Sequence, residues 1–336
     1  MVVRGVQKRQ KQKKDDKAQV GSGSGLRFEK KHGQHILRNP GVLEKIVSAA
    51  DIRQTDTVLE IGPGTGNLTM NMLQKAKQVH AIEIDPRMVA EVKKRAFSCG
   101  RNNLKVTEGC ALRTQYPVFD VCVANMPYQI SSPFTFKLLA HRPLFRCAVL
   151  MFQKEFCDRL VAECGDSDYG RLAVNVALFC KVTMVCKVSR GSFNPPPEVD
   201  SAVVKIVPRN PPIQVNFREW DGMMRIVFCR KNKILQSSFN TKPVMKALET
   251  NYKTYCSMKG IQPTKQPFKQ FIMDILKESG LGEQRACKTE LDEFFKLLLA
   301  FNSKGVHFVN TAIEASSKKD PNDVSFMFED GDVEME

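Results

Sequence analysis

Short apolar segments that alternate with helix-like segments constrain the fold of this chain more than any other sequence feature. Four of them, each rich in Val, Ile or Phe, lie at residues 57–61, 78–83, 119–124 and 146–152, and residues 104–106 predict a short additional strand. Apolar strands separated by helices predict a parallel sheet covered on both faces. Two further apolar segments, 181–187 and 202–207, are joined without a helix, which predicts an antiparallel pair at one edge. The chain is therefore expected to adopt an α/β fold.

The sequence changes character near residue 210. The segment RNPP is followed by helical patterns at about 216–230, 232–239, 242–250, 267–279 and 289–300. Near the other end, Asn39 and Pro40 predict a helix start, since Asn caps helices and Pro suits the first helical position. We expect four regions: a disordered basic tail (1–25) ending in GSGSG, an α/β domain (26–210), a small all-α domain (211–310) and a disordered acidic tail (311–336).

The charge indicates a polyanionic partner. The net charge is +15, and it is not confined to the tails, because residues 1–32 contribute +7 and residues 316–336 contribute −5. Lys and Arg bind nucleic acid by displacing condensed counterions from phosphates. The N-terminal run KRQKQKKDDK is typical of a nuclear address or an RNA-binding arm, although a solvated tail has the same composition.

The cysteines favour a reducing compartment. There are 11 of them, an odd number, no pair has CxxC spacing, and most lie in apolar segments. No zinc site has suitable ligand spacing, so we expect no metal. No apolar run reaches the roughly 18 residues that span a bilayer, and no secretory leader is evident, so we expect no membrane association.

A glycine-rich turn with a downstream acid indicates a nucleoside cofactor. The apolar segment VLEI leads into Gly62, Gly64 and Gly66 with GxGxG spacing, which differs from the GxGxxG of pyrophosphate-binding sites. Glycines at a strand-to-helix turn let the backbone approach a ligand closely. Glu83, at the end of the next strand, can accept hydrogen bonds from a ribose diol. A diol site without a phosphate cradle suits S-adenosylmethionine.

The tetrapeptide Asn125-Met126-Pro127-Tyr128 follows another strand, where ligand chemistry gathers in open parallel sheets. The exocyclic amine of adenine is a poor nucleophile, and acceptors aimed at its N–H bonds help it to pyramidalise. The Asn125 side-chain carbonyl and the Met126 backbone carbonyl are suitable acceptors, and Tyr128 can stack on the base. A plain turn would also use Asn and Pro. Phe193, held before three prolines, is a second candidate for stacking, or else a core residue.

Several segments together resemble the ribosomal RNA adenine dimethyltransferase family, in its eukaryotic nucleolar branch. They are FEKKHGQHILRNP (28–40), LEIGPGTGNLT (59–69), IEIDPR (82–87), VANMPYQISSP (123–133), MFQKEF (151–156) and SFNPPPEVDSAVVKI (192–206). Together they cover nearly all of residues 26–308.

This resemblance implies a class I methyltransferase fold, Rossmann-like, with a seven-stranded, mostly parallel sheet and a small helical C-terminal domain. It implies dimethylation of two adjacent adenosines in a hairpin near the 3′ end of small-subunit (18S) ribosomal RNA during ribosome biogenesis. The expected partners are that RNA and the pre-ribosomal particle, the expected location is the nucleus and nucleolus, and the expected state is a monomer.

The resemblance also assigns residues. Gln34, His35 and Leu37 would line the methionine end of the cofactor, Asn125 would close the cofactor site, and Gly62 and Glu83 match cofactor contacts. The helical domain would face RNA through Arg230, Lys231 and Lys233. Two positions depart from the family pattern: Met126 stands where Leu or Ile is usual, and Cys110 stands where an Asp bonds the cofactor's adenine amine. A thiol is a weak acceptor, which predicts weak cofactor binding.

Four functions compete on these observations. The first is an active adenine dimethyltransferase, favoured by the intact Asn125–Tyr128 tetrapeptide. The second is a pre-ribosome binding factor with weak or no activity, favoured by Cys110. A DNA adenine methyltransferase is disfavoured by the tetrapeptide and the Gly-Gln-His segment, and a nicotinamide dehydrogenase by the glycine spacing.

Overall fold

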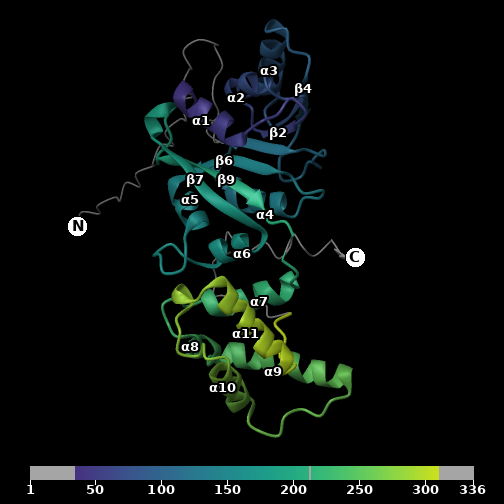
Figure 1. The fold of residues 1–336 in the computed structure, drawn as a ribbon, viewed down its shortest axis with the longest axis vertical. Helices are drawn as coiled ribbons and strands as arrows, with labels where there is room; N and C mark the ends of the chain where they lie inside the picture. The colour runs from purple at the N-terminus through teal and green to yellow at the C-terminus, as the bar shows by residue number, and fades with distance from the viewer. Residues whose placement is uncertain (1–34, 212, 310–336) are drawn as a thin grey trace, which may run out of the picture.

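Seven strands form one sheet in the order β4-β3-β2-β5-β6-β9-β7 in the computed structural model, which describes residues 35–211 and 213–309 (Figure 1). The strands are β2 (Thr57–Ile61), β3 (Gln78–Glu83), β4 (Leu104–Glu108), β5 (Val121–Asn125), β6 (Cys147–Gln153), β7 (Cys180–Val188) and β9 (Ser201–Pro208). The strands from β4 to β6 are parallel to one another, whereas β9 is antiparallel to both β6 and β7. This confirms the mostly parallel sheet and its antiparallel edge.

Helices cover both faces of the sheet. One face packs against α1 (Pro40–Ala50), α2 (Asn67–Met72) and α3 (Pro86–Ser98), the other against α4 (Ser131–Leu139), α5 (Lys154–Val161) and α6 (Arg171–Phe179). Successive side chains along a strand alternate between these two cores, as strand geometry requires: Val149 and Met151 face the first set, Leu150 and Phe152 the second. The sheet is therefore buried on both sides, and its strand ends are left to form a site.

The helix starting at Pro40 begins as predicted. The Asn39 side-chain oxygen accepts hydrogen bonds from the N–H groups of Gly41 and Val42, at 3.0 and 3.3 Å. Just before it, the short strand β1 (Ile36–Leu37) pairs antiparallel with β8 (Phe193–Asn194), more than 150 residues away. This pair is not among the strands predicted from the sequence. It fastens the segment before α1 to the Pro-rich loop beside the strand ends.

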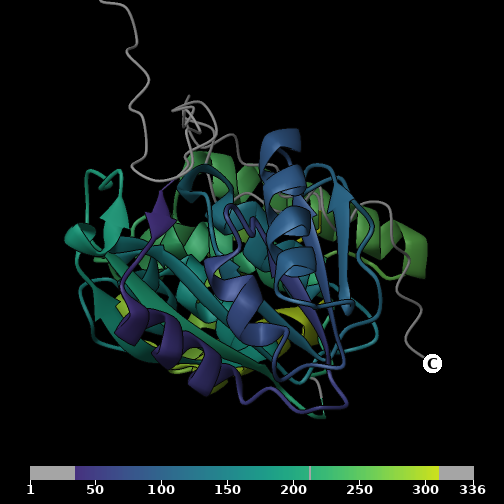
Figure 2. The same cartoon turned by 90° about the horizontal axis from the view of Figure 1, so that it is seen from above.

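Beyond residue 211 the described chain is helical. The helices are α7 (Phe217–Phe228), α8 (Leu235–Phe239), α9 (Lys242–Lys259), α10 (Phe268–Glu278) and α11 (Leu291–Ser303), with a short 3₁₀ turn at Ala286–Lys288 before α11. Two further 3₁₀ turns, at Tyr128–Ile130 and Arg190–Ser192, lie in the part of the chain that holds the sheet. Figure 1 shows these helices below the sheet, so that the molecule is elongated, and in Figure 2, the view from above, they lie behind the sheet. Four helices match the prediction within about three residues, but α9 continues nine residues past its predicted end.

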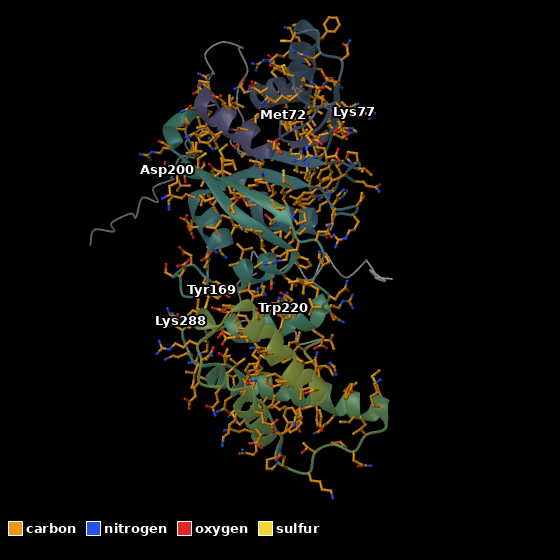
Figure 3. The ribbon with its side chains drawn as sticks, viewed as in Figure 1. Met72, Lys77, Tyr169, Asp200, Trp220 and Lys288 are labelled. Atoms are coloured by element: carbon orange, nitrogen blue, oxygen red, sulfur yellow. The ribbon has the colours of Figure 1, made fainter. Side chains whose placement is uncertain are left out.

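A buried polar network joins the two parts at α6 and α7. Asn175 of α6 donates to Asp221 (2.9 Å) and accepts from the Trp220 indole (3.0 Å), while Arg225 donates to the other Asp221 oxygen (2.8 Å). Figure 3 places Tyr169, Trp220 and Lys288 at this junction. Every one of these hydrogen bonds is fully or partly buried. The network therefore specifies one arrangement of α6 against α7, which apolar contacts alone would not do. The predicted domain boundary near residue 210 stays a prediction.

Candidate active site

The carboxyl ends of β4, β3, β2 and β5 meet at one edge of the sheet, where they line a cavity of about 250 Å³. This is the place where an open α/β sheet binds its ligands. The predicted residues that line it are His35, Leu37, Gly62, Gly64, Glu83, Cys110, Asn125, Met126, Pro127 and Tyr128. The structure therefore brings together residues from four separate strand ends, although the role of each side chain stays a prediction.

The glycine-rich turn at the end of β2 has a left-handed backbone conformation, which residues with a side chain rarely adopt. Gly62, Gly64 and Gly66 have φ angles of 65°, 53° and 86°. A Cβ on Gly64 would lie 3.2 Å from the Ile36 side chain, in the part of the turn that lines the cavity. Arg95 of α3 donates to the Thr65 carbonyl at 2.9 Å and so holds the turn in place. Gly66 does not line the cavity; it caps the start of α2.

Glu83 presents its carboxylate at the end of β3. One oxygen accepts from the Gly64 N–H at 3.1 Å, and the other accepts from the N–H groups of Ile84 and Asp85 at 2.9 and 3.0 Å. Burial raises the pKa of Glu83 above its ordinary value, and these three hydrogen bonds oppose the rise. A carboxylate has about four lone-pair directions, so one remains on the oxygen that accepts from Gly64, and it can accept from one hydroxyl of a diol.

Asn125 lies at the end of β5 and faces the same cavity as Gly62 and Glu83. Its amide nitrogen donates to the His35 carbonyl at 3.0 Å, and the His35 ring donates from Nδ1 to the Pro195 carbonyl at 2.9 Å. Because a carbonyl can only accept, the contact with His35 identifies the amide nitrogen of Asn125 and therefore also its oxygen. Within the described residues, Oδ1 of Asn125 has no hydrogen-bond donor, so it is left as the acceptor.

The rest of the tetrapeptide forms the wall beside Asn125. Met126 is buried and its N–H donates to the Met151 carbonyl at 3.1 Å, which extends the pairing of β5 with β6. The Tyr128 hydroxyl shares a 2.7 Å hydrogen bond with the Ser201 hydroxyl, and its ring lies nearly parallel to that of His35, with centroids 6.3 Å apart. The half-buried ring is therefore held in one orientation at the cavity.

The part of the cavity predicted to bind the cofactor's adenine lies at the end of β4. Cys110 follows this strand, is half-buried and lines the cavity. Glu108, the neighbouring acid, is exposed and does not line the cavity, so it does not replace the missing Asp. Instead, the residues after Cys110 form a tight turn whose carbonyls are bound by Lys137 of α4.

Two expected residues occupy other places. The Phe193 ring is 5% exposed and packs in the core that includes Leu37 and Val188, because the β1–β8 pairing turns it inward. This burial favours the alternative of a core residue, and the stacking role of Phe193 stays a prediction. Lys231 donates to the carbonyls of Ser167 (2.6 Å) and Tyr169 (3.2 Å), so its ammonium binds protein at the junction. Gln34 lies outside the described residues.

Several residues of the cavity were not predicted. Ile36, Ile84 and Met88 form apolar wall, and Glu60 of β2 lies beneath it. Ile84 could have been found, since it directly follows the Glu83 carboxylate at a strand end. Glu60 is fully buried, and its carboxylate accepts from the Thr69 hydroxyl at 2.7 Å. Burial raises the pKa of Glu60 to about 8; the Thr69 hydrogen bond opposes this rise and the charge of Glu83 adds to it.

The buried Glu60 makes folding stability depend on pH. Its pKa in the folded protein is above the value of 4.5 for an exposed Glu, so the folded protein keeps a proton that the unfolded chain releases. Stability is therefore lost as the pH rises from 4.5 to about 8. We expect Glu60→Gln to be more stable than wild type at pH 8, by on the order of a few kcal/mol, and the gain to shrink toward pH 5.

Urea unfolding at pH 5, 6.5 and 8 measures this difference. Glu44→Gln, on the exposed face of α1, is the matched control and should not reproduce the pH-dependent gain. A constant difference between Glu60→Gln and wild type at all three pH values would contradict the prediction.

The described residues contain no group of three or more His, Cys, Asp or Glu side chains placed to hold a metal ion. Among the described helices, none combines the length and the apolar character that crossing a bilayer requires.

Comparisons with known proteins agree with this geometry. Residues 25–277 match the family model described as ribosomal RNA adenine dimethylase. The chain is 54% identical to a Caenorhabditis elegans protein named "Probable dimethyladenosine transferase", over 89% of this chain and 99% of that one. It is 50% identical to the dimethyladenosine transferase of Schizosaccharomyces pombe, over 84% and 93% of the two chains.

A solved structure has the same fold. The crystal structure of a dimethyladenosine transferase from Plasmodium falciparum superposes with a TM-score of 0.78 at 54% identity, covering 82% of this chain and 100% of that chain. The matches of sequence and of fold agree with each other. This chain belongs to the ribosomal RNA adenine dimethylase family and is an S-adenosylmethionine-dependent methyltransferase.

Proposed function

We propose that this chain dimethylates the exocyclic amines of two adjacent adenosines in the 3′-end hairpin of small-subunit (18S) ribosomal RNA, as part of ribosome biogenesis. The observation that carries the proposal is the position of Asn125, whose Oδ1 is left as an acceptor in the cavity that Gly62 and Glu83 also line. A methyl donor bound by the glycine turn and an amine held by Asn125 would therefore meet in one cavity.

The residues present fit S-adenosylmethionine. The glycine turn leaves room that a Cβ would fill, Glu83 offers a carboxylate to a ribose diol, and Ile84 and Met88 supply apolar wall for a purine. His35 and Leu37 lie at the Asn125 side of the cavity, where we place the methionine end. When bound, the cofactor supplies an electrophilic methyl group on a positively charged sulfur.

The chain's own residues act on the amine. Asn125 Oδ1 and the Met126 carbonyl accept hydrogen bonds from the two N–H groups of the amine. These hydrogen bonds draw the nitrogen toward the pyramidal geometry that nucleophilic attack requires. Both acceptors are fixed before the reaction, Asn125 by His35 and Met126 by Met151, so they stabilise the transition state without reorganising. Tyr128, held by Ser201, orients the base by stacking. A base in a hairpin loop costs less to present than one in a duplex.

RNA would be positioned by the helical part. Arg230 and Lys233 are exposed on the segment after α7, where they are free to contact phosphates, which set position and not sequence. The +15 charge supports an RNA partner, and we propose the pre-ribosomal particle as its context. The nucleus and nucleolus as the location, and a monomer as the working state, belong to the same proposal.

Salt dependence of RNA binding tests this surface. We expect the double variant Arg230→Ala, Lys233→Ala to bind a small-subunit 3′-end hairpin more weakly. Its plot of log K against log[salt] should be less steep, by roughly 0.7–0.9 per lost phosphate contact. Lys231→Met, which removes a neighbouring cation that binds protein carbonyls, is the matched control and should keep the wild-type slope. Filter binding between 50 and 300 mM salt provides the measurement; equal slopes for all three proteins would count against the surface.

A second function is favoured by one observation. Cys110 lines the cavity where the family pattern has an acidic acceptor, and among the described residues its acidic neighbour Glu108 does not line the cavity. A chain that binds cofactor weakly can still act in assembly as an RNA-binding factor of the pre-small-subunit.

Methyl transfer from labelled cofactor decides between the two functions. The substrates are a small-subunit 3′-end RNA fragment and the corresponding pre-ribosomal particle, and the matched control is Asn125→Ala. Label in adenine with wild type alone supports the enzyme. No label on either substrate, with RNA binding intact, would support the assembly factor.

A further inference from the structure

Lys137 makes an unusual set of contacts for a lysine on the surface of a helix. Its ammonium donates to three backbone carbonyls of one loop: Ala111 at 3.0 Å, Leu112 at 2.9 Å and Thr114 at 2.7 Å. The same ammonium lies 4.2 Å from the centre of the Tyr116 ring. Because an ammonium has three N–H bonds and all three are used, Lys137 has none left for an RNA phosphate.

The loop that Lys137 holds is a single helical turn. The N–H groups of Arg113 and Thr114 both donate to the Cys110 carbonyl, at 3.0 and 2.9 Å. The carbonyls at the end of such a turn have no partner within it, and a cation is favourable there. Tyr116 adds a further bond from its hydroxyl to the Ala111 carbonyl, at 2.6 Å. The turn is therefore fixed mainly from its carboxyl-terminal end.

The beginning of the same turn faces the cofactor cavity. Gly109, Cys110 and Ala111 all line it. The Gly109 N–H donates to the Glu83 carbonyl at 2.8 Å, whereas the Ala111 N–H has no acceptor within the described part of the chain. Since the Cys110 thiol is a weak acceptor, the strongest hydrogen-bonding group that this turn offers a purine is a backbone N–H.

We propose that Lys137 is a positioning residue for adenine recognition: by binding the carbonyls of the Cys110–Thr114 turn, it holds the backbone N–H of Ala111, near the start of that turn, in place for a ring nitrogen of the purine. The inference rests on the proposed placement of the cofactor's adenine beside Cys110. It assigns Lys137 a role through the turn, without contact to the cofactor, and it makes adenine selectivity depend on α4.

Selectivity for the base is the measurement that separates this role from a general effect on folding. S-Adenosylhomocysteine is compared with its inosine counterpart, in which oxygen replaces the 6-amino group and the ring nitrogen beside it carries a hydrogen. That ring nitrogen no longer accepts from a backbone N–H. Both ligands are titrated calorimetrically into wild type, Lys137→Met and Lys231→Met, the last being a matched control that also loses a lysine bound to loop carbonyls.

We expect wild type to prefer the adenine ligand by about tenfold or more, which is the range for one well-placed hydrogen bond in a buried site. Lys137→Met should bind the adenine ligand about tenfold more weakly and lose most of the preference. Lys231→Met should keep both the affinity and the preference.

Three outcomes would overturn the inference. A Lys137→Met protein that keeps the wild-type preference removes the role of Lys137, and a wild type that binds both ligands equally removes the recognition itself. If Lys137→Met does not fold, Lys137→Gln replaces it, because a neutral, shorter amide cannot supply the three hydrogen bonds of the ammonium; an unchanged preference in that variant is equally contrary. Failure of wild type to bind either ligand would instead refute the cofactor site on which the proposal rests.

Discussion

Replacing Asn125 by Ala should reduce the rate of methyl transfer by about 10²- to 10³-fold, the usual cost of removing one preorganised polar group that acts on a transition state. The side chain supplies the acceptor that faces the cavity, and its amide nitrogen is already bound to the His35 carbonyl. No neighbouring group can take over this acceptor, since Met126 contributes only its backbone. The loss should appear mainly in turnover under single-turnover conditions with saturating cofactor.

The control for this variant is Asn71→Ala, which removes an exposed Asn from α2. It should retain wild-type turnover, and both variants should retain the thermal unfolding midpoint within a few degrees. An Asn125→Ala protein with more than about a tenth of the wild-type rate would exclude the proposed grip on the amine.

Cys110→Asp should have the next largest effect, and in the opposite direction. A carboxylate accepts a charge-assisted hydrogen bond from the adenine amine, which is worth roughly 1.5–3 kcal/mol, or about tenfold to 150-fold in cofactor affinity. The position lies in the cavity and close to the Lys137 ammonium, which favours the ionised form of an introduced acid. Calorimetric titration with S-adenosylhomocysteine measures the change.

Cys110→Ser controls for the loss of the thiol itself. Because serine offers no negative charge, its affinity should stay within a few-fold of wild type. Equal affinities of wild type and Cys110→Asp would refute the prediction, and they would also show that this position contributes little to adenine binding.

The sheet and most helices follow from local patterns. Apolar runs such as residues 57–61 and 78–83 could be assigned because each is short and followed by a turn, and Asn39 with Pro40 marks a helix start. The end of α9 was missed because its buried stripe is narrow. Val244, Leu248, Tyr252 and Cys256 recur at every fourth residue, but after Leu248 the positions between them are mostly polar, so the helical pattern looks complete by residue 250.

The site residues also fall into two groups, those predictable from the local sequence and those that are not. Gly62, Glu83 and Asn125 could be predicted because each lies at the end of a strand or directly after it, and parallel strands bring such positions to one edge. Phe193, Lys231 and Lys137 could not be placed, because their positions depend on partners far away in the sequence: the β1–β8 pairing, the loop before α6 and the turn after β4. A loop phenylalanine and a helical lysine carry no local sign of such partners.

Helix α6 serves two hydrophobic cores at once. Leu172 and Val176 pack under the sheet, whereas Ala173, Val174 and Leu178 pack with Trp220 and the helices beyond it. A truncated protein ending at residue 210 would expose this second face of α6 to water and leave Asn175 without its Asp221 and Trp220 partners. Expression of residues up to 210 alone should therefore yield aggregated material, and a chimaera that exchanges the C-terminal helices between relatives would have to carry α6 with them.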